Sequence, residues 1–254
     1  MAEGFPWFTP DGYRRILERA LELGYRIQCF RDFLPGRDAP RLLLRHDLDH
    51  SIRAALVSAD TETRLGVCST YFVQVECSFY NLLSAESRVL IAELVSGGHE
   101  IGLHFSAGRY RGEQGARRWR LDLALLEDLA GHSIHSASQH LPSSTERFDP
   151  GDLIRREAYR EPFMGKEMGY ISDSLMAWRQ ATPLEWIEER RSFQFLTHPM
   201  TWSRQVNDLD QALDLAVAEE VQQLRAELAR TRTLYHDLLA ARERLDAEFR
   251  RSRG

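Results

Sequence analysis

The chain is 254 residues long, and its 43% hydrophobic and 28% charged residues, with a mean hydropathy of −0.42, describe an ordinary globular protein. This composition excludes a disordered chain and a membrane-embedded one, and the length suffices for a substantial core. The 33 basic and 38 acidic residues leave a net charge of −5, so no global positive field exists to hold a nucleic-acid backbone. We therefore expect no nucleic-acid partner.

The cysteine content and the first residues of the chain bear on its compartment. Cys29, Cys68 and Cys77 are an odd number of cysteines without CxxC spacing, and the N-terminus has neither a basic nor an apolar signal region. Both features predict a reducing compartment, the cytoplasm, and we expect no transmembrane segment.

Residues 1–204 alternate helix-like and strand-like segments. A helix is predicted to begin at Thr9 and Pro10, as N-cap and first helical residue, and to end at Gly24. Strands are predicted at 41–45, 67–75, 99–103, 134–138, 170–171 and 193–197, and further helices at 51–65, 85–95 and 115–129. Repeated β-then-α units predict an α/β domain with a largely parallel sheet.

The composition changes near Ser203, because residues 206–251 contain no Gly and no Pro. We predict a domain at 1–204 followed by a long amphipathic helix at 205–254. Residues of this segment recur at alternating spacings of three and four, which defines a heptad seam that is apolar except at Thr231 and Arg242, its two weak members. The seam residues are Val221, Leu224, Leu228, Thr231, Tyr235, Leu238, Arg242, Leu245 and Phe249. The seam predicts a coiled-coil homodimer, and a helix folded back over the same chain is the alternative.

Acidic and histidine side chains stand where the predicted strands end. They are Asp47, Asp49, His99, His104, His140, Asp173 and His198. Reactive groups of parallel α/β folds gather at the carboxyl ends of strands, so this set predicts a metal-dependent hydrolytic site.

Asp47 and Asp49 are two residues apart, so an extended strand points both carboxylates to one face. Two anions that close require a cation, which one of them would bind while the other acts as acid or base. The alternative is that one of them caps the helix that begins near Ser51.

The positions of the histidines relative to the predicted strands predict different roles for them. His99 and His104 are an odd number of residues apart, so they face opposite sides of a continuous strand, and we assign His104 to the site and His99 to a structural hydrogen bond. His198 suits proton donation to a leaving group, and His140 lies in a loop where functional residues are common. Asp173 either orients one of these groups or caps the next helix.

Three stretches in this order, Arg45–Asp49, Gly98–His104 and Leu196–Pro199, resemble the NodB-homology polysaccharide deacetylases of carbohydrate esterase family 4, and most closely their surface-polysaccharide biosynthesis branch. The resemblance covers residues 10–202. It implies a distorted (β/α) barrel with a divalent metal, usually zinc, that removes N-acetyl groups from a sugar or polysaccharide precursor.

Carried over by position, the resemblance implies that Asp47 is the catalytic base and His198 the acid. It implies that Asp49 and His104 bind the metal. The family commonly has a second histidine four residues after the first, where this chain has Gly108. We assign the third ligand to His140, with His99 and His50 as alternatives.

Two other functions fit the same residues. Without a third ligand, the chain would be a catalytically degenerate glycan-binding or assembly protein. A complete site would also support cleavage of another non-peptide C–N bond, such as deformylation. Loop-end aromatic residues are candidates for sugar-stacking walls: Phe105, Tyr110 and Trp202.

Overall fold

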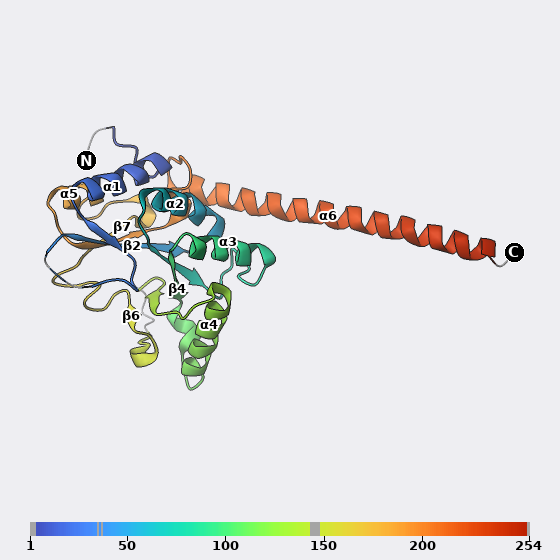
Figure 1. Ribbon diagram of the computed structural model, residues 1–254, viewed down its shortest axis with the longest axis horizontal. Coiled ribbons are helices and arrows are strands. Elements are labelled where there is room, and N and C mark those ends of the chain that lie inside the picture. The colour runs from blue at the N-terminus through green and yellow to red at the C-terminus, as the bar shows by residue number, and fades with distance from the viewer. Residues whose placement is uncertain (1–3, 35, 37, 143–147, 253–254) are drawn as a thin grey trace. The chain divides into compact units, whose positions relative to one another are not determined.

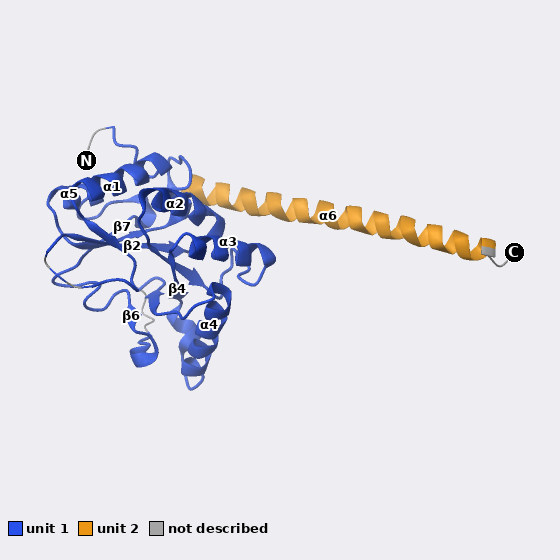
Figure 2. Cartoon of the chain, in the orientation of Figure 1, with its two compact units in different colours: residues 1–209 blue, residues 210–254 orange. Residues whose placement is uncertain are grey.

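The computed structural model describes residues 4–34, 36, 38–142 and 148–252 and divides the chain into two units, Met1–Leu209 and Asp210–Gly254 (Figure 2). Among these described residues, no helix combines the length and the apolar character needed to cross a bilayer.

Unit 1 is built on a parallel sheet that curls into a half-barrel, which confirms the predicted α/β fold of the distorted-barrel type (Figure 1). Its strands run in the order β6-β5-β4-β3-β2-β8-β7, and β1 pairs additionally with β2. The strands are β1 (Arg26–Gln28), β2 (Arg41–Leu48), β3 (Thr70–Gln74), β4 (Glu100–Phe105), β5 (Ser136–Gln139), β6 (Arg156–Glu157), β7 (Gly169–Ser172) and β8 (Phe193–Thr197). Every pairing is parallel, so the carboxyl ends of the strands gather at one end of the sheet.

Helices link the strands and cover the outside of the sheet (Figure 1). They are α1 (Pro10–Glu22), α2 (Ile52–Leu65), α3 (Ala85–Ser96), α4 (Gly115–Ala130) and α5 (Pro183–Glu188), with short 3-10 helices η1 (Ala107–Tyr110), η2 (Gly151–Leu153), η3 (Ser174–Met176) and η4 (Pro199–Thr201). Side-chain caps set their starts: the Thr9 hydroxyl accepts from the Gly12 backbone N–H, and Ser51 caps α2 in the same way.

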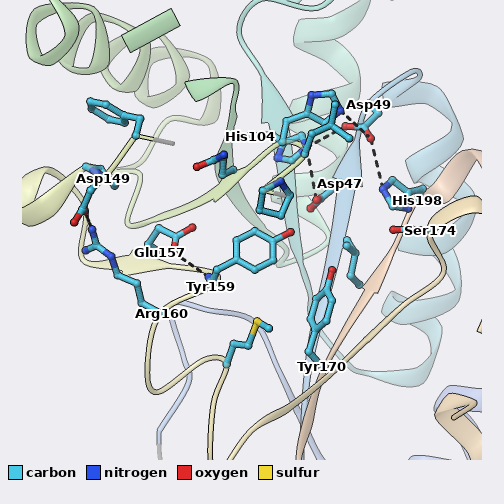
Figure 3. A pocket seen from close by; sticks show the side chains of 18 of the residues that line it. Asp47, Asp49, His104, Asp149, Glu157, Tyr159, Arg160, Tyr170, Ser174 and His198 are labelled. Carbon is cyan, nitrogen blue, oxygen red and sulfur yellow. Dashed lines mark hydrogen bonds and ion pairs between the residues drawn. The ribbon is translucent and has the colours of Figure 1, made fainter. Parts of the chain in front are cut away.

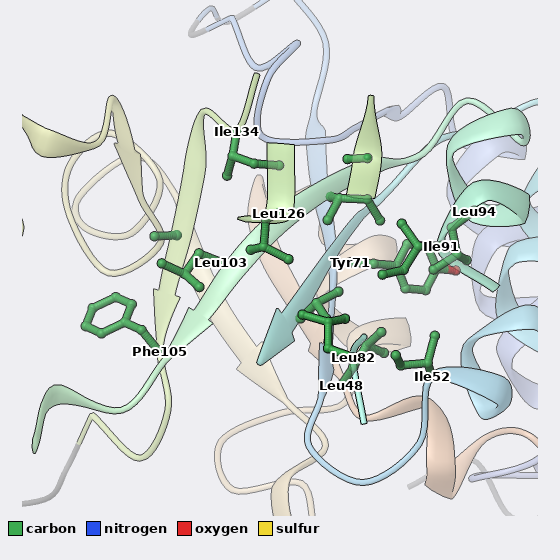
Figure 4. Packing of buried hydrophobic residues seen from close by; sticks show 14 of the residues in the cluster. Leu48, Ile52, Tyr71, Leu82, Ile91, Leu94, Leu103, Phe105, Leu126 and Ile134 are labelled. Atoms are coloured by element: carbon green, nitrogen blue, oxygen red, sulfur yellow. The ribbon is translucent and has the colours of Figure 1, made fainter. Parts of the chain in front are cut away.

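The largest apolar cluster lies between the sheet and helices α2, α3 and α4, and Figure 4 shows its side chains. Leu103 and Ile101 of β4 are fully buried there, as are Ile91 of α3 and Leu126 of α4. A second cluster fills the space between α1, α5 and strands β2, β7 and β8. These clusters fix the strands, and thereby the residues that follow them.

Some predicted bounds were wrong. The strand expected at 67–75 is Thr70–Gln74, because Gly66 ends α2 in the left-handed conformation and a connection precedes the strand. His104 lies within β4 instead of beyond it, because Gln74 of β3 and Ser138 of β5 both pair with it. The sequence analysis missed β1 and β6, which have only three and two residues.

The described residues of unit 2 all belong to α6 (Leu209–Ser252), an uninterrupted helix of 44 residues whose first residue is the last of unit 1. Its start at Leu209 is four residues after Gln205, the first residue expected in the helix. Because unit 2 is a single helix, no other segment of that unit can cover its heptad seam.

Candidate metal centre

The predicted site residues come from neighbouring strand ends. Asp47 belongs to β2 and Asp49 follows that strand, His104 belongs to β4, and His140 and His198 directly follow β5 and β8. All five line one pocket of about 690 Å³, and Figure 3 shows four of them, Asp47, Asp49, His104 and His198, close together. The parallel pairing therefore brings together residues that are up to 151 positions apart in the chain.

Asp49 is surrounded by imidazole nitrogens. Its Oδ1 lies 3.0 Å from Nε2 of His104, and its Oδ2 lies 3.6 Å from Nε2 of His140 and 3.5 Å from Nε2 of His198. Burial alone raises the pKa of Asp49, but the three histidines hold that pKa far below its usual range. The carboxylate is ionised at neutral pH.

The hydrogen bonding of His104 is compatible with a cation site. Nδ1 lies 2.9 Å from the Ser138 carbonyl oxygen, which can only accept, so this nitrogen carries a hydrogen. In the neutral ring Nε2 then presents a lone pair, and no described residue donates a hydrogen bond to this buried atom. It faces Asp49 Oδ1, another acceptor, at 3.0 Å. A proton on Nε2 satisfies this contact, and although burial lowers the pKa of His104, Asp47 and Asp49 raise it above its usual value and so favour that proton. A divalent cation satisfies it equally, because an imidazole beside a carboxylate is a ligand pair that zinc and related ions take.

His140 completes a set of three donors. Asp49, His104 and His140 each offer one ligand atom, and these atoms lie within 4.8 Å of one another. The backbone N–H of His140 donates to the Phe105 carbonyl at 2.8 Å, which anchors the start of its loop on β4. Burial lowers the pKa of His140 and so favours the neutral ring that binds metals.

The other positions considered for the third ligand lie elsewhere. Gly108 is exposed on η1, and the His50 ring packs against Phe79 with 4.5 Å between ring centroids. His99 directly precedes β4, and its Nδ1 lies 3.3 Å from Glu62 Oε2. This contact is of the structural kind expected for His99, and it belongs to a buried network outside the pocket.

That network lies on the helix side of the sheet. Glu62 of α2 lies 2.6 Å from Nε2 of His46 and accepts from the hydroxyls of Ser69, Tyr71 and Tyr13. His46 precedes Asp47, so the two side chains leave β2 on opposite faces. A fully buried carboxylate with this many partners ties α2 to the sheet beneath the site.

Arg45 holds Asp47 in place. Its Nη2 lies 2.7 Å from Asp47 Oδ2 and its Nε 3.2 Å from Oδ1, while other guanidinium hydrogens go to Ser138, Tyr159 and Gln194. Burial raises the pKa of Asp47, but Arg45 and then His104 and His198 lower it below the usual value. Asp47 is therefore an oriented carboxylate, ionised at neutral pH, whose Oδ2 lies 3.6 Å from His104 Nε2.

His198 is paired with Asp173. Nδ1 lies 2.6 Å from Asp173 Oδ1, and Asp173 Oδ2 accepts from the His198 backbone N–H at 2.8 Å and from Trp202 Nε1 at 2.7 Å. Burial lowers the pKa of His198, but Asp173, followed by Asp49 and Asp47, raises it to about 9. His198 is thus protonated at neutral pH, with Nε2 directed toward Asp49.

The capping alternatives for the aspartates are wrong. Ser51 caps α2 in place of Asp47 or Asp49, and Asp173 precedes η3 without a side-chain cap bond. The sequence analysis also left the role of Arg45 unassigned, although it lies in a quoted stretch and shares a strand face with Asp47. No sequence signal marks Tyr159, because it reaches Arg45 only through the fold.

The predicted sugar-stacking residues were wrong, because Phe105, Tyr110 and Trp202 are each at most 3% exposed and belong to the core. The aromatic residues that line the pocket are Tyr159, Tyr170 and Phe148.

Comparisons with known proteins identify similar folds. No family model and no curated protein matches the chain. A family 4 carbohydrate esterase pseudoenzyme from Bacillus anthracis is similar over 76% of this chain and 66% of its own, with 11% identity and a TM-score of 0.43. The chain thus spans slightly less than two thirds of that protein's length.

Other similar structures are named as deacetylases or esterases. The catalytic domain of a peptidoglycan N-acetylglucosamine deacetylase from Eubacterium rectale shares 14% identity, with 77% of this chain and 87% of that one covered and a TM-score of 0.44. A family 4 acetyl xylan esterase from Clostridium thermocellum, in complex with a cobalt ion, shares 15% identity over 73% and 84%, with a TM-score of 0.35. These are proteins of the family that the motifs resemble.

Proposed function

We propose that the chain is a metal-dependent hydrolase that removes an N-acetyl group from a sugar or polysaccharide precursor. The observation that carries this proposal is the grouping of Asp49, His104 and His140 around one point, with Asp47 and His198 on the same pocket floor. A binding module would gain nothing from two carboxylates, Asp47 and Asp49, that both lie within 3.6 Å of one imidazole nitrogen.

Each of the five side chains has a role in the proposed reaction. Asp49, His104 and His140 would hold a divalent cation, and we propose zinc because it accepts mixed imidazole and carboxylate ligands. The ion supplies Lewis acidity at the pocket floor. Asp47, oriented by Arg45, accepts the proton of the attacking water, and His198, protonated through Asp173, donates a proton to the departing amine.

The pocket walls suit a polar, ring-shaped substrate. Tyr159 and Tyr170 present their rings side by side, with centroids 6.0 Å apart, and Glu157 and Arg160 add polar groups to the same wall (Figure 3). Aromatic faces pack against sugar rings while polar groups bind their hydroxyls. An acetylated carbohydrate is therefore the proposed substrate class.

The test measures metal content and product together. The purified full chain is analysed for bound metal and then incubated with N-acetylated sugars and oligosaccharides while acetate is measured. We expect close to one divalent ion per chain and acetate release. Asp47→Asn should keep the ion and lose activity about 10²-fold or more, the usual contribution of a positioned base.

Other results would favour the alternative functions. A metal-free wild type that binds glycans without releasing acetate would support the glycan-binding or assembly protein. Formate release from formylated amides, without acetate release from sugars, would support a different C–N hydrolase. Either result would overturn the deacetylase proposal.

We also propose that a second copy of the chain covers the heptad seam of α6. With the seam at heptad positions a and d, Glu220 and Glu227 occupy g, and Arg225 and Arg232 occupy e. In a parallel, in-register pair each g residue faces the e residue five positions later in the other copy, so both glutamates face arginines. An antiparallel pair places g opposite g and e opposite e and therefore forms neither of these Glu–Arg contacts, so the charges favour the parallel dimer.

A further inference from the structure

Two cysteines contact each other outside the pocket that contains the candidate metal centre. Cys29 follows β1 and Cys68 precedes β3, and their Sγ atoms lie 3.5 Å apart. They meet because β1 pairs with residues 41–43 of β2 and β3 pairs with residues 45–48, one after the other along the same edge of that strand. The end of β1 therefore faces the start of β3.

The two thiols differ in access to solvent. Cys29 is fully buried, whereas Cys68 is half-buried. The Cys68 thiol donates to the Cys29 sulfur, so the two sulfurs are in direct contact. A half-buried thiol that lies next to a second thiol has the features of an oxidation-sensitive site.

Asp32 completes the arrangement. The Cys29 thiol donates to Asp32 Oδ2 at 3.0 Å, and the Asp32 carboxylate is 56% exposed. The carboxylate can therefore take the Cys29 proton and pass it to water. The sequence spacing gave no sign of this group, because Cys29 and Cys68 are 39 positions apart.

We propose that Cys29 and Cys68 form a peroxide-reactive dithiol that closes reversibly to a disulfide. The Cys68 thiolate attacks one oxygen of hydrogen peroxide, the O–O bond breaks, and with one proton the products are a sulfenic acid and water. Cys29 sulfur then attacks the Cys68 sulfur, its proton passes to Asp32, and the displaced hydroxide leaves as water after protonation. Overall, two thiols lose two electrons to one peroxide, which yields two waters.

The chain contains its own control. Cys77 is also half-buried, but its Sγ contacts the Asp49 carbonyl and the Phe79 backbone N–H, both at 3.4 Å, instead of a second thiol. Cys68 and Cys77 are therefore similar in exposure, and they differ in that only Cys68 lies next to a second sulfur. Cys29 and Cys68 should react together and Cys77 should lag behind.

The test uses the full chain in its reduced form. Dilute hydrogen peroxide is added, remaining thiols are blocked with N-ethylmaleimide, and peptides are analysed by mass spectrometry with and without later reduction. We expect a loss of two of the three thiols, one cross-linked peptide pair that contains Cys29 and Cys68, and full recovery with dithiothreitol. In Cys29→Ser, Cys68 should stop at a sulfenic acid that dimedone traps, and Cys77→Ser should still form the cross-link.

Three results would overturn the proposal. They are retention of all three thiols at peroxide concentrations that oxidise free cysteine, a cross-link that involves Cys77, and equal oxidation of Cys68 and Cys77 without a cross-link. Tight binding of Zn²⁺ that protects Cys29 and Cys68 from peroxide, and that Asp32→Asn abolishes, would show instead that the group is a metal site. Because the readout is on thiols alone, it does not depend on deacetylase activity.

Discussion

The pairing of His198 with Asp173 makes a quantitative prediction about the pH dependence of the proposed reaction. Asp173 is 1% exposed and lies 2.6 Å from Nδ1 of His198, whose pKa is raised to about 9. A group that acts as an acid must be protonated, so activity should fall as the pH rises through this value. Asp173→Asn keeps the size of the side chain, and its amide oxygen can still accept from Trp202.

The asparagine removes the charge that favours protonated His198. An adjacent opposite charge shifts a pKa by about 1–3 units, so the alkaline limb of kcat/KM should move down by that amount. For a shift of about 2 units, to near pH 7, the protonated fraction at pH 8 drops from about 90% to about 10%, while at pH 6 it stays near 90%. The rate ratio of wild type to variant should therefore rise from near 1 at pH 6 to about 10 at pH 8.

The assay is acetate release measured from pH 5.5 to 10, with bound metal measured in parallel. Asp149→Asn is the matched control, because Asp149 lines the same pocket but is paired with Arg160. NMR titration of the His198 ring supplies a second readout that does not depend on turnover. An identical rate loss at pH 6 and pH 8, or an unchanged His198 pKa in the variant, would refute the reasoning.

Three further predictions concern the metal, the stability and the helix. His140→Ala should weaken metal binding by about 10-fold or more, whereas His50→Ala should leave metal binding unchanged, as titration with Zn²⁺ would show; equal effects would contradict the ligand assignment. Because the folded-state pKa of His198 is raised, its stabilisation is complete below pH 6.5 and is lost as the pH rises to about 9. The free energy of urea unfolding of the metal-free chain should fall by up to about 3 kcal/mol over this range, and Asp173→Asn should make this fall smaller, because only the contribution of Asp49 and Asp47 remains. Deletion of residues 210–254 should convert a dimer to a folded monomer by light scattering, and Arg225→Glu with Arg232→Glu should weaken the dimer; a wild-type monomer would contradict the coiled coil.

Much of the scaffold was predictable from local patterns. The segment at 193–197 coincides with β8, and the helices at 51–65, 85–95 and 115–129 differ from the observed ones by at most one residue at either end. These elements carry strong local signals. An apolar run ended by Pro199 indicates β8, Ser51 indicates the start of α2, and Gly97 indicates the end of α3. The odd separation of 99 and 104 predicts that the two histidines point in opposite directions. His104 of β4 lines the pocket, whereas His99, which precedes that strand, contacts Glu62 of α2 outside it.

Other features depend on pairing between distant segments. His140 reaches Asp49 only because β5 pairs with β4, and β1 and β6 are too short to have a period of their own. From the sequence, Asp173 could cap a helix or orient a functional side chain. The pairing of β7 with β8 places it beside His198 and so gives it the second role.

The sequence by itself determined the alternation of strands and helices, the strand-end position of the acids and histidines, and the heptad seam of α6. These follow from contacts within a few residues of the chain, where side-chain spacing and backbone propensity decide the outcome. Only the tertiary structure shows that His140 lies beside Asp49 and His104, which side chains contact Asp47 and His198, and that Cys29 contacts Cys68. Each of these depends on which strands lie side by side, and that order is set by burial of the whole apolar surface rather than by any local pattern.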